Sequence, residues 1–237
     1  MANSYFKLRQ FTIQQDKCAM KVCTDSCFFG ATMANKKLPA FNCLDIGTGT
    51  GILALMLAQK NENIVIDAVE IDTNAALQAT ENIAASPWAN RIRVINEDIL
   101  TFKPTGPYDC IISNPPFFEN DLQSPHEPVN KARHNISLGL HQLLKFAGAN
   151  LSDTGNFAVL LPYQHLDIFI EEAKKKGFYL TQQILVKQTI KHQFFRGILF
   201  FKRTQSETQY QEIIIKELNN SYTTEFAAAM KEYYLFL

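Results

Sequence analysis

The chain has 237 residues, of which 46% are apolar, 19% charged and 11% aromatic, and its 23 basic side chains balance 23 acidic ones. This composition is typical of a globular protein, and it excludes disordered and collagen-like classes and a strongly basic nucleic-acid or membrane binder. The charge is nevertheless segregated, at +4 over residues 1–40, −8 over 41–130, +7 over 131–203 and −3 over 204–237. A neutral chain of this kind can still present a basic face to phosphates.

The first half of the chain alternates predicted strands and helices. Short apolar runs at 41–47, 64–70, 91–95 and 108–113 are typical of buried strands, and helical spacing of apolar residues predicts helices at about 50–60 and from Asp72 to before Pro87. Parallel strands that helices connect form an open, doubly wound sheet, because right-handed crossovers place helices on both faces. We therefore expect an α/β fold with a mostly parallel sheet.

The pattern changes in the second half. It predicts a fifth strand at 156–161 between helices near 137–151 and 163–176, further strands at 178–188, 194–203 and 210–218, and a last helix at 222–235. Several strands with little helix between them predict an antiparallel edge of the sheet. Residues 114–134 contain four prolines and predict a long irregular loop, and such loops are usually functional.

The cysteines and the hydropathy indicate the compartment. The sequence contains five cysteines, Cys18, Cys23, Cys27, Cys43 and Cys110, and no recognisable secretory leader. No apolar run reaches the ~20 residues that cross a bilayer. We therefore expect free thiols in a cytoplasmic protein without a membrane partner. The first three cysteines lack the paired spacing and the histidines of a zinc site, so no metal is expected.

A glycine-rich turn, Asp45-Ile46-Gly47-Thr48-Gly49-Thr50-Gly51, joins the first strand of the predicted sheet to a helix. Glycines let the backbone pass close to a ligand, and the start of a helix offers unpaired N–H groups. The spacing differs from the dinucleotide pattern, because Ile52 stands where that pattern has Gly or Ala, and Asp45 would repel a pyrophosphate. S-adenosyl-L-methionine (SAM) lacks phosphate and carries cationic groups that suit a carboxylate. The alternative is an ordinary turn.

Two carboxylates follow the next two predicted strands. Glu70 ends the strand after the glycine-rich turn, where an acidic side chain can accept both ribose hydroxyls of a nucleoside cofactor. Asp98 follows the third strand, where it can accept a hydrogen bond from an adenine amino group. Each residue alone is more often a solvated loop acid. Because ligands of such sheets bind at the carboxyl edge, the three strand ends together predict a nucleoside-cofactor site.

The segment Asn114-Pro115-Pro116-Phe117 ends the fourth predicted strand and is the strongest chemical signal. Adjacent prolines stiffen the backbone and remove two N–H donors, while Phe117 offers a flat ring. A planar conjugated amine is a poor nucleophile, so two acceptors, Asn114 Oδ1 and the Pro115 carbonyl, are suited to hold its hydrogens with the lone pair towards the SAM methyl group. Positioning and electrostatics then provide the catalysis. The alternative is a proline-rich turn with a core phenylalanine.

These motifs resemble those of Rossmann-like SAM-dependent methyltransferases, whose glycine loop, ribose acid, adenine-side acid and Asn-Pro-Pro-aromatic motif match Asp45–Gly51, Glu70, Asp98 and Asn114–Phe117. Over the whole chain the sequence resembles the bacterial tRNA1(Val) (adenine(37)-N6)-methyltransferase family. The segments similar to that family are Gln10–Asp25, Leu53–Gln59, Ser86–Ala89, Ile111–Pro116 and Tyr234–Leu237. Two positions depart from its pattern, since Cys23 replaces a glycine and Phe117 a tyrosine.

The resemblance implies a single SAM-methyltransferase domain, with a segment at 1–40 that covers the cofactor, a Rossmann-like core at 41–203 and a strand and helix at 204–237. It implies catalytic roles for Asn114, Pro115, Pro116 and Phe117. The implied cofactor-binding residues are Asp45, Gly47, Gly49, Gly51, Glu70, Asp98, Lys21 and Thr24, with no metal. For Lys21, Thr24 and Asp25 a simple capping turn is the alternative.

The implied substrate is the adenosine at position 37 of tRNA, immediately 3′ of the anticodon. A base of a single-stranded loop can be splayed out and stacked on an aromatic ring such as Phe117. Phosphates need cations, and the candidates are Lys7, Arg9, Lys36, Lys37, Lys131, Arg133, Lys191, His192, Arg196, Lys202 and Arg203. We expect a monomer that binds tRNA and neither DNA nor membranes, in which the amine loses its proton after methyl transfer.

Other functions remain open at this point. Asn-Pro-Pro-aromatic motifs also serve enzymes that methylate guanine N2 of ribosomal RNA or a glutamine amide of release factors, and only the flanking segments favour adenine. DNA adenine methyltransferases use similar residues, but this chain has no room for a sizeable target-recognition domain. A non-catalytic SAM-binding or RNA-chaperone module is the alternative of a different class, and the intact Asn114–Phe117 motif argues against it.

Overall fold

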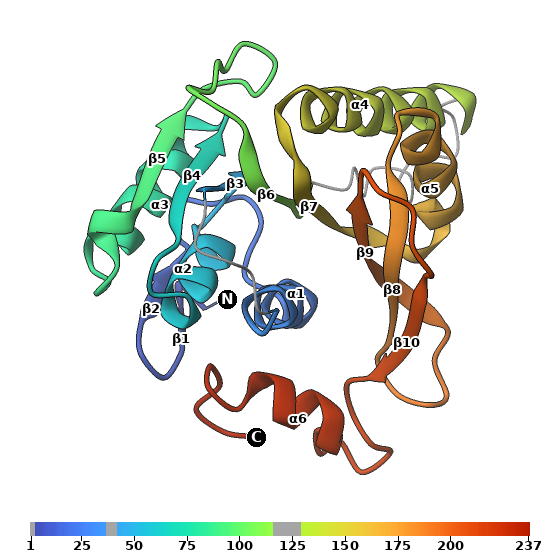
Figure 1. Ribbon diagram of the computed structural model, residues 1–237. Coiled ribbons are helices and arrows are strands. Elements are labelled where there is room, and N and C mark those ends of the chain that lie inside the picture. Colours follow the sequence, from blue (N-terminus) through green and yellow to red (C-terminus); the bar gives the residue numbers. More distant parts are fainter. Residues whose placement is uncertain (1–2, 37–41, 116–128) are drawn as a thin grey trace.

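The computed structural model describes residues 3–36, 42–115 and 129–237, with side chains from residue 139 onward in the last range (Figure 1). The strands are β1 (Tyr5–Lys7), β2 (Thr12–Gln14), β3 (Asn42–Ile46), β4 (Val65–Glu70), β5 (Ile92–Asn96), β6 (Tyr108–Ser113), β7 (Leu151–Pro162), β8 (Tyr179–Lys187), β9 (Phe194–Lys202) and β10 (Gln209–Ile214). The helices are α1 (Thr24–Ala34), α2 (Ile52–Lys60), α3 (Thr73–Ala84), α4 (Val129–Asn150), α5 (Leu166–Lys175) and α6 (Thr224–Met230), with short 3-10 turns η1 (Ala89–Arg91) and η3 (Tyr163–His165).

Eight of the strands form one sheet in the order β10-β8-β9-β7-β6-β3-β4-β5. The strands β3 to β7 run parallel, so their carboxyl ends share one edge of the sheet. Strand β9 is antiparallel to both β7 and β8. After β9 a short loop reverses the chain and crosses β8, so that β10 pairs with the other side of β8 and runs parallel to it. The predicted α/β class, with a mostly parallel sheet and antiparallel carboxyl-terminal strands, is confirmed.

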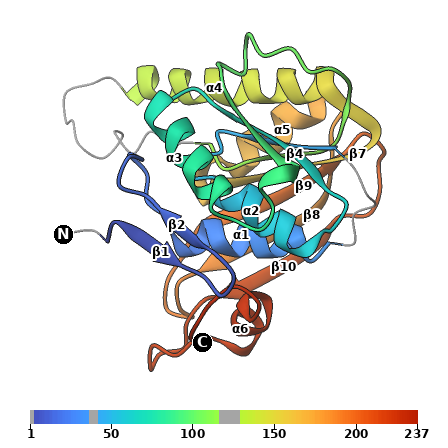
Figure 2. The ribbon, with the colours of Figure 1, turned by 90° about the vertical axis from the view of Figure 1, so that its left-hand side faces the viewer.

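Helices cover both faces of this sheet, and alternate residues of each strand pack against opposite layers. On one face Cys43 and Ile66 pack with α1, α2, α3 and α6 in a single buried cluster. On the other face Leu44 and Ile111 pack with α4 and α5. Figure 2 shows α4 on the opposite side of the sheet from α1 and α2. Strands that are buried on both faces explain why their sequences are near-continuous apolar runs.

Several predicted boundaries are wrong. Helix α4 begins at Val129, inside the loop predicted for 114–134, and β7 begins at Leu151, well before the predicted 156. The strand predicted for 210–218 ends at Ile214, and the helix predicted for 222–235 ends at Met230. The β1–β2 hairpin and α1 were not predicted, because three-residue strands are too short to show a period of two and α1 is apolar on nearly every side.

Candidate active site

The glycine-rich turn joins β3 to α2 at the carboxyl edge of the sheet. Gly47, Gly49 and Gly51 have φ angles of 72°, 56° and 82°, in the left-handed region where a side chain would strain the backbone. The N–H groups of Gly47 and Thr48 both donate to the Val69 carbonyl at the end of β4, at 2.9 and 3.1 Å. The turn is therefore fixed against the neighbouring strand, and glycines are required by its conformation.

Asp45 lies under this turn with 0% of its surface exposed. Its Oδ2 accepts a 2.7 Å hydrogen bond from the Thr48 hydroxyl, whereas Oδ1 is buried and has no hydrogen-bond partner in the described part of the chain. Burial is the largest effect and raises the pKa of Asp45 to about 7. The Thr48 hydroxyl and the Ala54 N–H act in the opposite direction and lower this pKa, whereas the negative charge of Glu70 raises it further. A cationic group of a ligand would favour the ionised form and satisfy the free oxygen.

Glu70 is the last residue of β4 and Asp98 follows β5, so both lie at the same edge of the sheet. Glu70 is 8% exposed, and its two carboxylate oxygens accept 2.9 Å hydrogen bonds from the N–H groups of Gly49 and Asp72. Each oxygen keeps a further lone pair, so the carboxylate can still accept hydroxyl hydrogens. Asp98 is half-buried, and its Oδ1 accepts a 2.9 Å hydrogen bond from the Leu100 N–H.

Asn114 and Pro115 follow β6, the strand next to β3. The Ser113 hydroxyl donates to the Ile46 carbonyl at 2.9 Å and ties the ends of these two strands together. Asn114 Oδ1 is shielded from solvent and accepts no hydrogen bond from any residue in the described ranges. Pro116 and Phe117 lie outside the described residues. The structure therefore brings both residues that carry the predicted amine acceptors, Asn114 and Pro115, to the strand end beside the glycine-rich turn.

A cavity of ≈ 330 Å³ opens between these strand ends and α4. Its lining is largely apolar and includes Gly47, Asp98, Ser113 and Pro115 from the predicted site or its supports, together with His165 of η3. A concave, mostly apolar cavity with a few polar groups is the usual form of a cofactor site. Its position at the carboxyl edge of a parallel sheet agrees with where such folds bind ligands.

The segment between β2 and α1 lies close to this edge, since the charges of Glu70 and Asp72 act on the Cys18 thiol. Lys21, expected at the cofactor, has its ammonium donating to the carbonyls of Gln15 and Cys18, so in this structure it holds its own loop together. Thr24, also expected there, hydrogen-bonds the phenol of Tyr234 near the carboxyl terminus.

The helix start beside Thr24 is unstrained although Cys23 replaces the family's glycine. Its φ of −126° and ψ of 161° are an extended conformation that any residue adopts, and Cys23 is the N-cap of α1. Cys23 is exposed, while the other four cysteines are buried, and all five are free thiols. Among the described residues, no three His, Cys, Asp or Glu side chains gather in a metal-binding group.

Sequence reasoning missed two polar residues that anchor this segment. Asn82, 2% exposed on α3, accepts from the Gln14 N–H at 2.8 Å and donates to the carbonyls of Gln14 and Thr50 at 2.8 and 2.9 Å. Gln78, 1% exposed and one turn earlier, accepts from the Lys17 N–H at 3.0 Å. Asn82 therefore joins the amino-terminal segment to the glycine-rich turn. The sequence does contain one signal for them: Gln78 and Asn82 stand four residues apart, at the spacing that places both amides on the buried face of α3.

Three of the arginines expected to bind phosphate have structural partners instead. Arg196 Nε donates to the buried carboxylate of Asp25 at 2.7 Å, and Arg9 Nε donates to the Tyr234 carbonyl at 2.7 Å. Arg203 donates to backbone carbonyls at the junction of α4 and β7. Lys36 is half-buried over the Phe200 ring, and burial lowers its pKa. Lys37 and the side chains of Lys131 and Arg133 lie outside the described residues.

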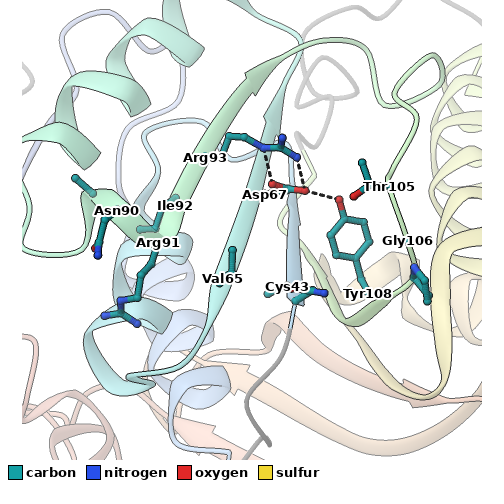
Figure 3. A pocket seen from close by; sticks show the side chains of 13 residues that line it. Cys43, Val65, Asp67, Asn90, Arg91, Ile92, Arg93, Thr105, Gly106 and Tyr108 are labelled. Atoms are coloured by element: carbon teal, nitrogen blue, oxygen red, sulfur yellow. Dashed lines mark hydrogen bonds and ion pairs between the residues drawn. The ribbon is translucent and has the colours of Figure 1, made fainter.

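A larger cavity, of ≈ 680 Å³, lies at the opposite edge of the sheet, where β3 to β6 begin (Figure 3). Asp67 is an acidic residue that lines this cavity. Its carboxylate already accepts hydrogen bonds from the Arg93 guanidinium at 2.9 and 3.0 Å and from the Tyr108 hydroxyl at 2.7 Å. Burial and the hydrogen bond to Asp67 raise the pKa of Tyr108. These mutual bonds make this cavity a structural feature and leave the carboxyl edge as the candidate active site.

Comparisons with known proteins identify the family of the chain. A family model described as the methyltransferase small domain matches residues 18–161. The chain is 42% identical over 236 residues to a tRNA1(Val) (adenine(37)-N6)-methyltransferase of Tolumonas auensis, covering 99% of this chain and 98% of that protein. It is 39% identical to the protein of that name from Bacteroides thetaiotaomicron, and the match covers all of both chains.

Solved structures share the fold at low sequence identity. A predicted O-methyltransferase of Agrobacterium tumefaciens has a TM-score of 0.66 at 15% identity, covering 88% of this chain and 96% of that one. A methyltransferase of Pyrococcus furiosus has a TM-score of 0.56 at 21% identity, covering 78% and 84%. None of the described helices is both long and apolar enough to span a membrane.

Proposed function

The chain belongs to the tRNA1(Val) (adenine(37)-N6)-methyltransferase family, and we propose that the carboxyl edge of its sheet divides this activity between a cofactor side and an acceptor side. The protein is a SAM-dependent enzyme that methylates N6 of adenosine 37 in tRNA1(Val). The observation that supports the division is a pair of buried oxygens, Asp45 Oδ1 and Asn114 Oδ1. Neither has a partner among the described residues, and they lie at adjacent strand ends.

The cofactor side consists of the glycine-rich turn with Asp45, Glu70 and Asp98. SAM supplies the methyl group, carried on its sulfonium. Asp45 offers a buried acceptor to a cationic group, and the turn of Gly47 to Gly51 lets the backbone approach the ligand closely. Glu70 is placed to accept ribose hydroxyls and Asp98 an adenine amino hydrogen, while Thr24 and Lys21 support the segment that covers this side.

The acceptor side consists of Asn114 and the motif that follows it. Asn114 Oδ1 would accept one hydrogen of the adenine amine and the Pro115 carbonyl the other, which directs the nitrogen lone pair towards the methyl group. The roles proposed for the next two residues rest on the family resemblance alone: Pro116 would stiffen the backbone, and the Phe117 ring would stack on the base. The amine loses its proton to solvent after transfer, so no general base is assigned. Positioning of a weak nucleophile supplies the rate enhancement.

Two further expectations remain proposals. We treat the whole chain, 1–237, as one domain, which is supported by the 2.8 Å hydrogen bond from the Arg9 N–H to the Tyr233 carbonyl near the other terminus. We also propose that the enzyme is cytoplasmic, because its substrate is a tRNA. The monomeric state stays an expectation.

The product identifies the reaction. Purified protein would be incubated with tritiated SAM and total tRNA from a strain that lacks the activity, and the tRNA digested to nucleosides. We expect the label in N6-methyladenosine. Label in N2-methylguanosine, or in a glutamine of a release factor added in a parallel reaction, would overturn the adenine assignment, and no label in single-turnover reactions would support a non-catalytic module.

Replacing Asn114 tests the division of the edge. Asn114→Ala should nearly abolish turnover, because the amine loses an acceptor, while SAM affinity measured by calorimetry stays within a few-fold. Asn35→Ala, at an exposed amide after α1, is the matched control and should behave like the unmodified enzyme. An equal collapse of SAM binding in Asn114→Ala would place this residue on the cofactor side and contradict the proposal.

A further inference from the structure

Two aromatic rings that the proposed mechanism does not use lie together at the carboxyl edge. Tyr163 follows the last residue of β7 and is 47% exposed, although it is a large aromatic residue. Its ring pairs with that of Phe194, the half-buried first residue of β9, at a centroid distance of 5.5 Å and an interplanar angle of 34°. An aromatic pair of this kind that reaches the surface presents a flat, apolar face to solvent.

The pair lies beside the acceptor side of the active site. Strand β7 is the neighbour of β6, whose end carries Asn114, and the register of the two strands pairs Ser113 with Val159, three residues before the end of β7. The turn η3 begins with Tyr163 and ends with His165, which lines the same cavity as Ser113 and Pro115. A single short turn therefore joins the exposed ring to the wall of the active-site cavity.

The hairpin of β8 and β9, which carries Phe194, contains basic residues but no acidic ones. From Tyr179 to Lys202 the sequence contains four basic residues and no Asp or Glu. At the end next to the rings, Lys187 Nζ lies 4.0 Å from the centroid of Phe194 and pairs loosely with Glu212 of β10, at 3.6 Å. Lys191 and His192 are exposed in the turn between β8 and β9, where His192 also bonds Thr189 at 2.7 Å.

We propose that Tyr163 and Phe194 form a stacking platform for a nucleotide next to adenosine 37, and that Lys187 and Lys191 contact the phosphates that flank it. The proposal rests on the proposed function and extends it to the single-stranded loop around the target. Aromatic faces beside cations are the usual means of holding single-stranded RNA, because every base has a flat face and every nucleotide a phosphate. Holding a neighbouring base keeps the loop open while adenosine 37 enters the cavity.

Binding of an anticodon stem-loop RNA with 2-aminopurine beside adenosine 37 tests the platform directly. In the unmodified enzyme the probe should be quenched on binding, which needs no variant. Tyr163→Leu and Phe194→Leu, which keep apolar volume but remove a flat ring, should weaken RNA binding roughly 5- to 150-fold. Tyr163→Phe keeps the ring and should stay within about 2-fold. SAM affinity should be unchanged in each.

The matched control is Tyr210→Leu, at a 74% exposed tyrosine on β10. Tyr210 is near the start of that strand, and the parallel pairing of β10 with β8 places it away from the β8–β9 turn. A Lys187→Met/Lys191→Met double variant should lower the slope of log affinity against log salt by about 0.7 for each phosphate that these lysines neutralise in the unmodified enzyme.

The outcomes separate this proposal from the function on which it rests. If the unmodified enzyme methylates tRNA and only the ring-removing variants bind RNA more weakly, with the probe quenched, the platform is supported. If the enzyme methylates tRNA but Tyr163→Leu binds RNA like Tyr210→Leu and the probe is not quenched, the platform is wrong and the function stands. If the unmodified enzyme does not methylate tRNA, both fail.

Discussion

The buried carboxylate of Asp45 should make SAM binding depend on pH. Its pKa of about 7 means that near neutrality a large fraction of the free enzyme holds this side chain protonated. A cationic ligand group prefers the ionised form, so binding below pH 7 must expel a proton. Within the pH range where Asp45 alone titrates, the apparent affinity should therefore fall about 25-fold between pH 7.5 and pH 5.5.

Calorimetry measures this linkage without turnover. At pH 6, titrating SAM into the enzyme should release about 0.9 proton, read from the dependence of the binding enthalpy on buffer ionisation enthalpy, and about half a proton at pH 7. The useful range is about pH 5.5 to 7.5, because an α-amino group itself loses its proton near pH 8. Asp45→Asn should bind more weakly, with no proton release. Equal proton release in this variant would refute the assignment.

The same carboxylate should also affect stability, and the sign is fixed by its raised pKa. Below about pH 3 both the folded and the unfolded state hold the proton, so Asp45 makes no difference to stability there. As pH rises to 7 the unfolded chain ionises first, and the free energy of unfolding falls by up to roughly 4 kcal/mol. Asp45→Asn should thus be the more stable protein above pH 7 in urea unfolding. A variant less stable at every pH would mean that the folded protein already stabilises the ionised carboxylate.

Two packing predictions follow from contacts around β9. Arg196→Met leaves the buried Asp25 carboxylate without its 2.7 Å partner and should lower the free energy of unfolding in urea by about 3 kcal/mol. The Asp25→Leu/Arg196→Met double variant, which removes both charges, should recover most of this loss. A loss well under 1 kcal/mol in the single variant would contradict the prediction. Gly197→Ala would place a Cβ 2.5 Å from Leu166 Cδ1 and should cost about 1–3 kcal/mol, whereas Gly106→Ala, in open space, should be neutral. If the contact with Leu166 causes this loss of stability, Gly197→Ala should cost almost nothing when it is introduced into a Leu166→Ala variant.

The core of the fold could be predicted because its strands are buried on both faces. The run at 64–70 is apolar except for Asp67 and the terminal Glu70, and it reappears as β4 (Val65–Glu70). The acidic and amide residues that end these strands could be placed together for the same reason, since parallel strands share a carboxyl edge. Glu70, Asp98 and Asn114 therefore lie along one edge, as the order of strands requires.

Side-chain partners far apart in sequence could not be predicted. Arg196 looks like a free cation in the sequence, yet its partner Asp25 is 171 positions away, and composition cannot tell a buried ion pair from a phosphate contact. Asn82 and Thr24 are further cases, because their bonds to Gln14 and Tyr234 arise only when the termini fold against α3 and α1. Local pattern places elements, whereas these roles depend on which elements meet.

The polar atoms that the fold leaves unsatisfied are themselves informative about function. A buried acceptor without a donor costs about 1–3 kcal/mol, so a protein keeps one where something else supplies the hydrogen. Four buried side-chain atoms of the described residues have no hydrogen-bond partner. Two of them belong to Gln59 and Arg203, and the other polar atoms of these side chains bond backbone carbonyls away from the site. The remaining two, Asp45 Oδ1 and Asn114 Oδ1, end neighbouring strands that the Ser113 hydroxyl ties together. A cationic donor molecule and an amine each bring the hydrogens that these oxygens lack, so the same two ligands that complete the chemistry also complete the hydrogen bonding of the fold.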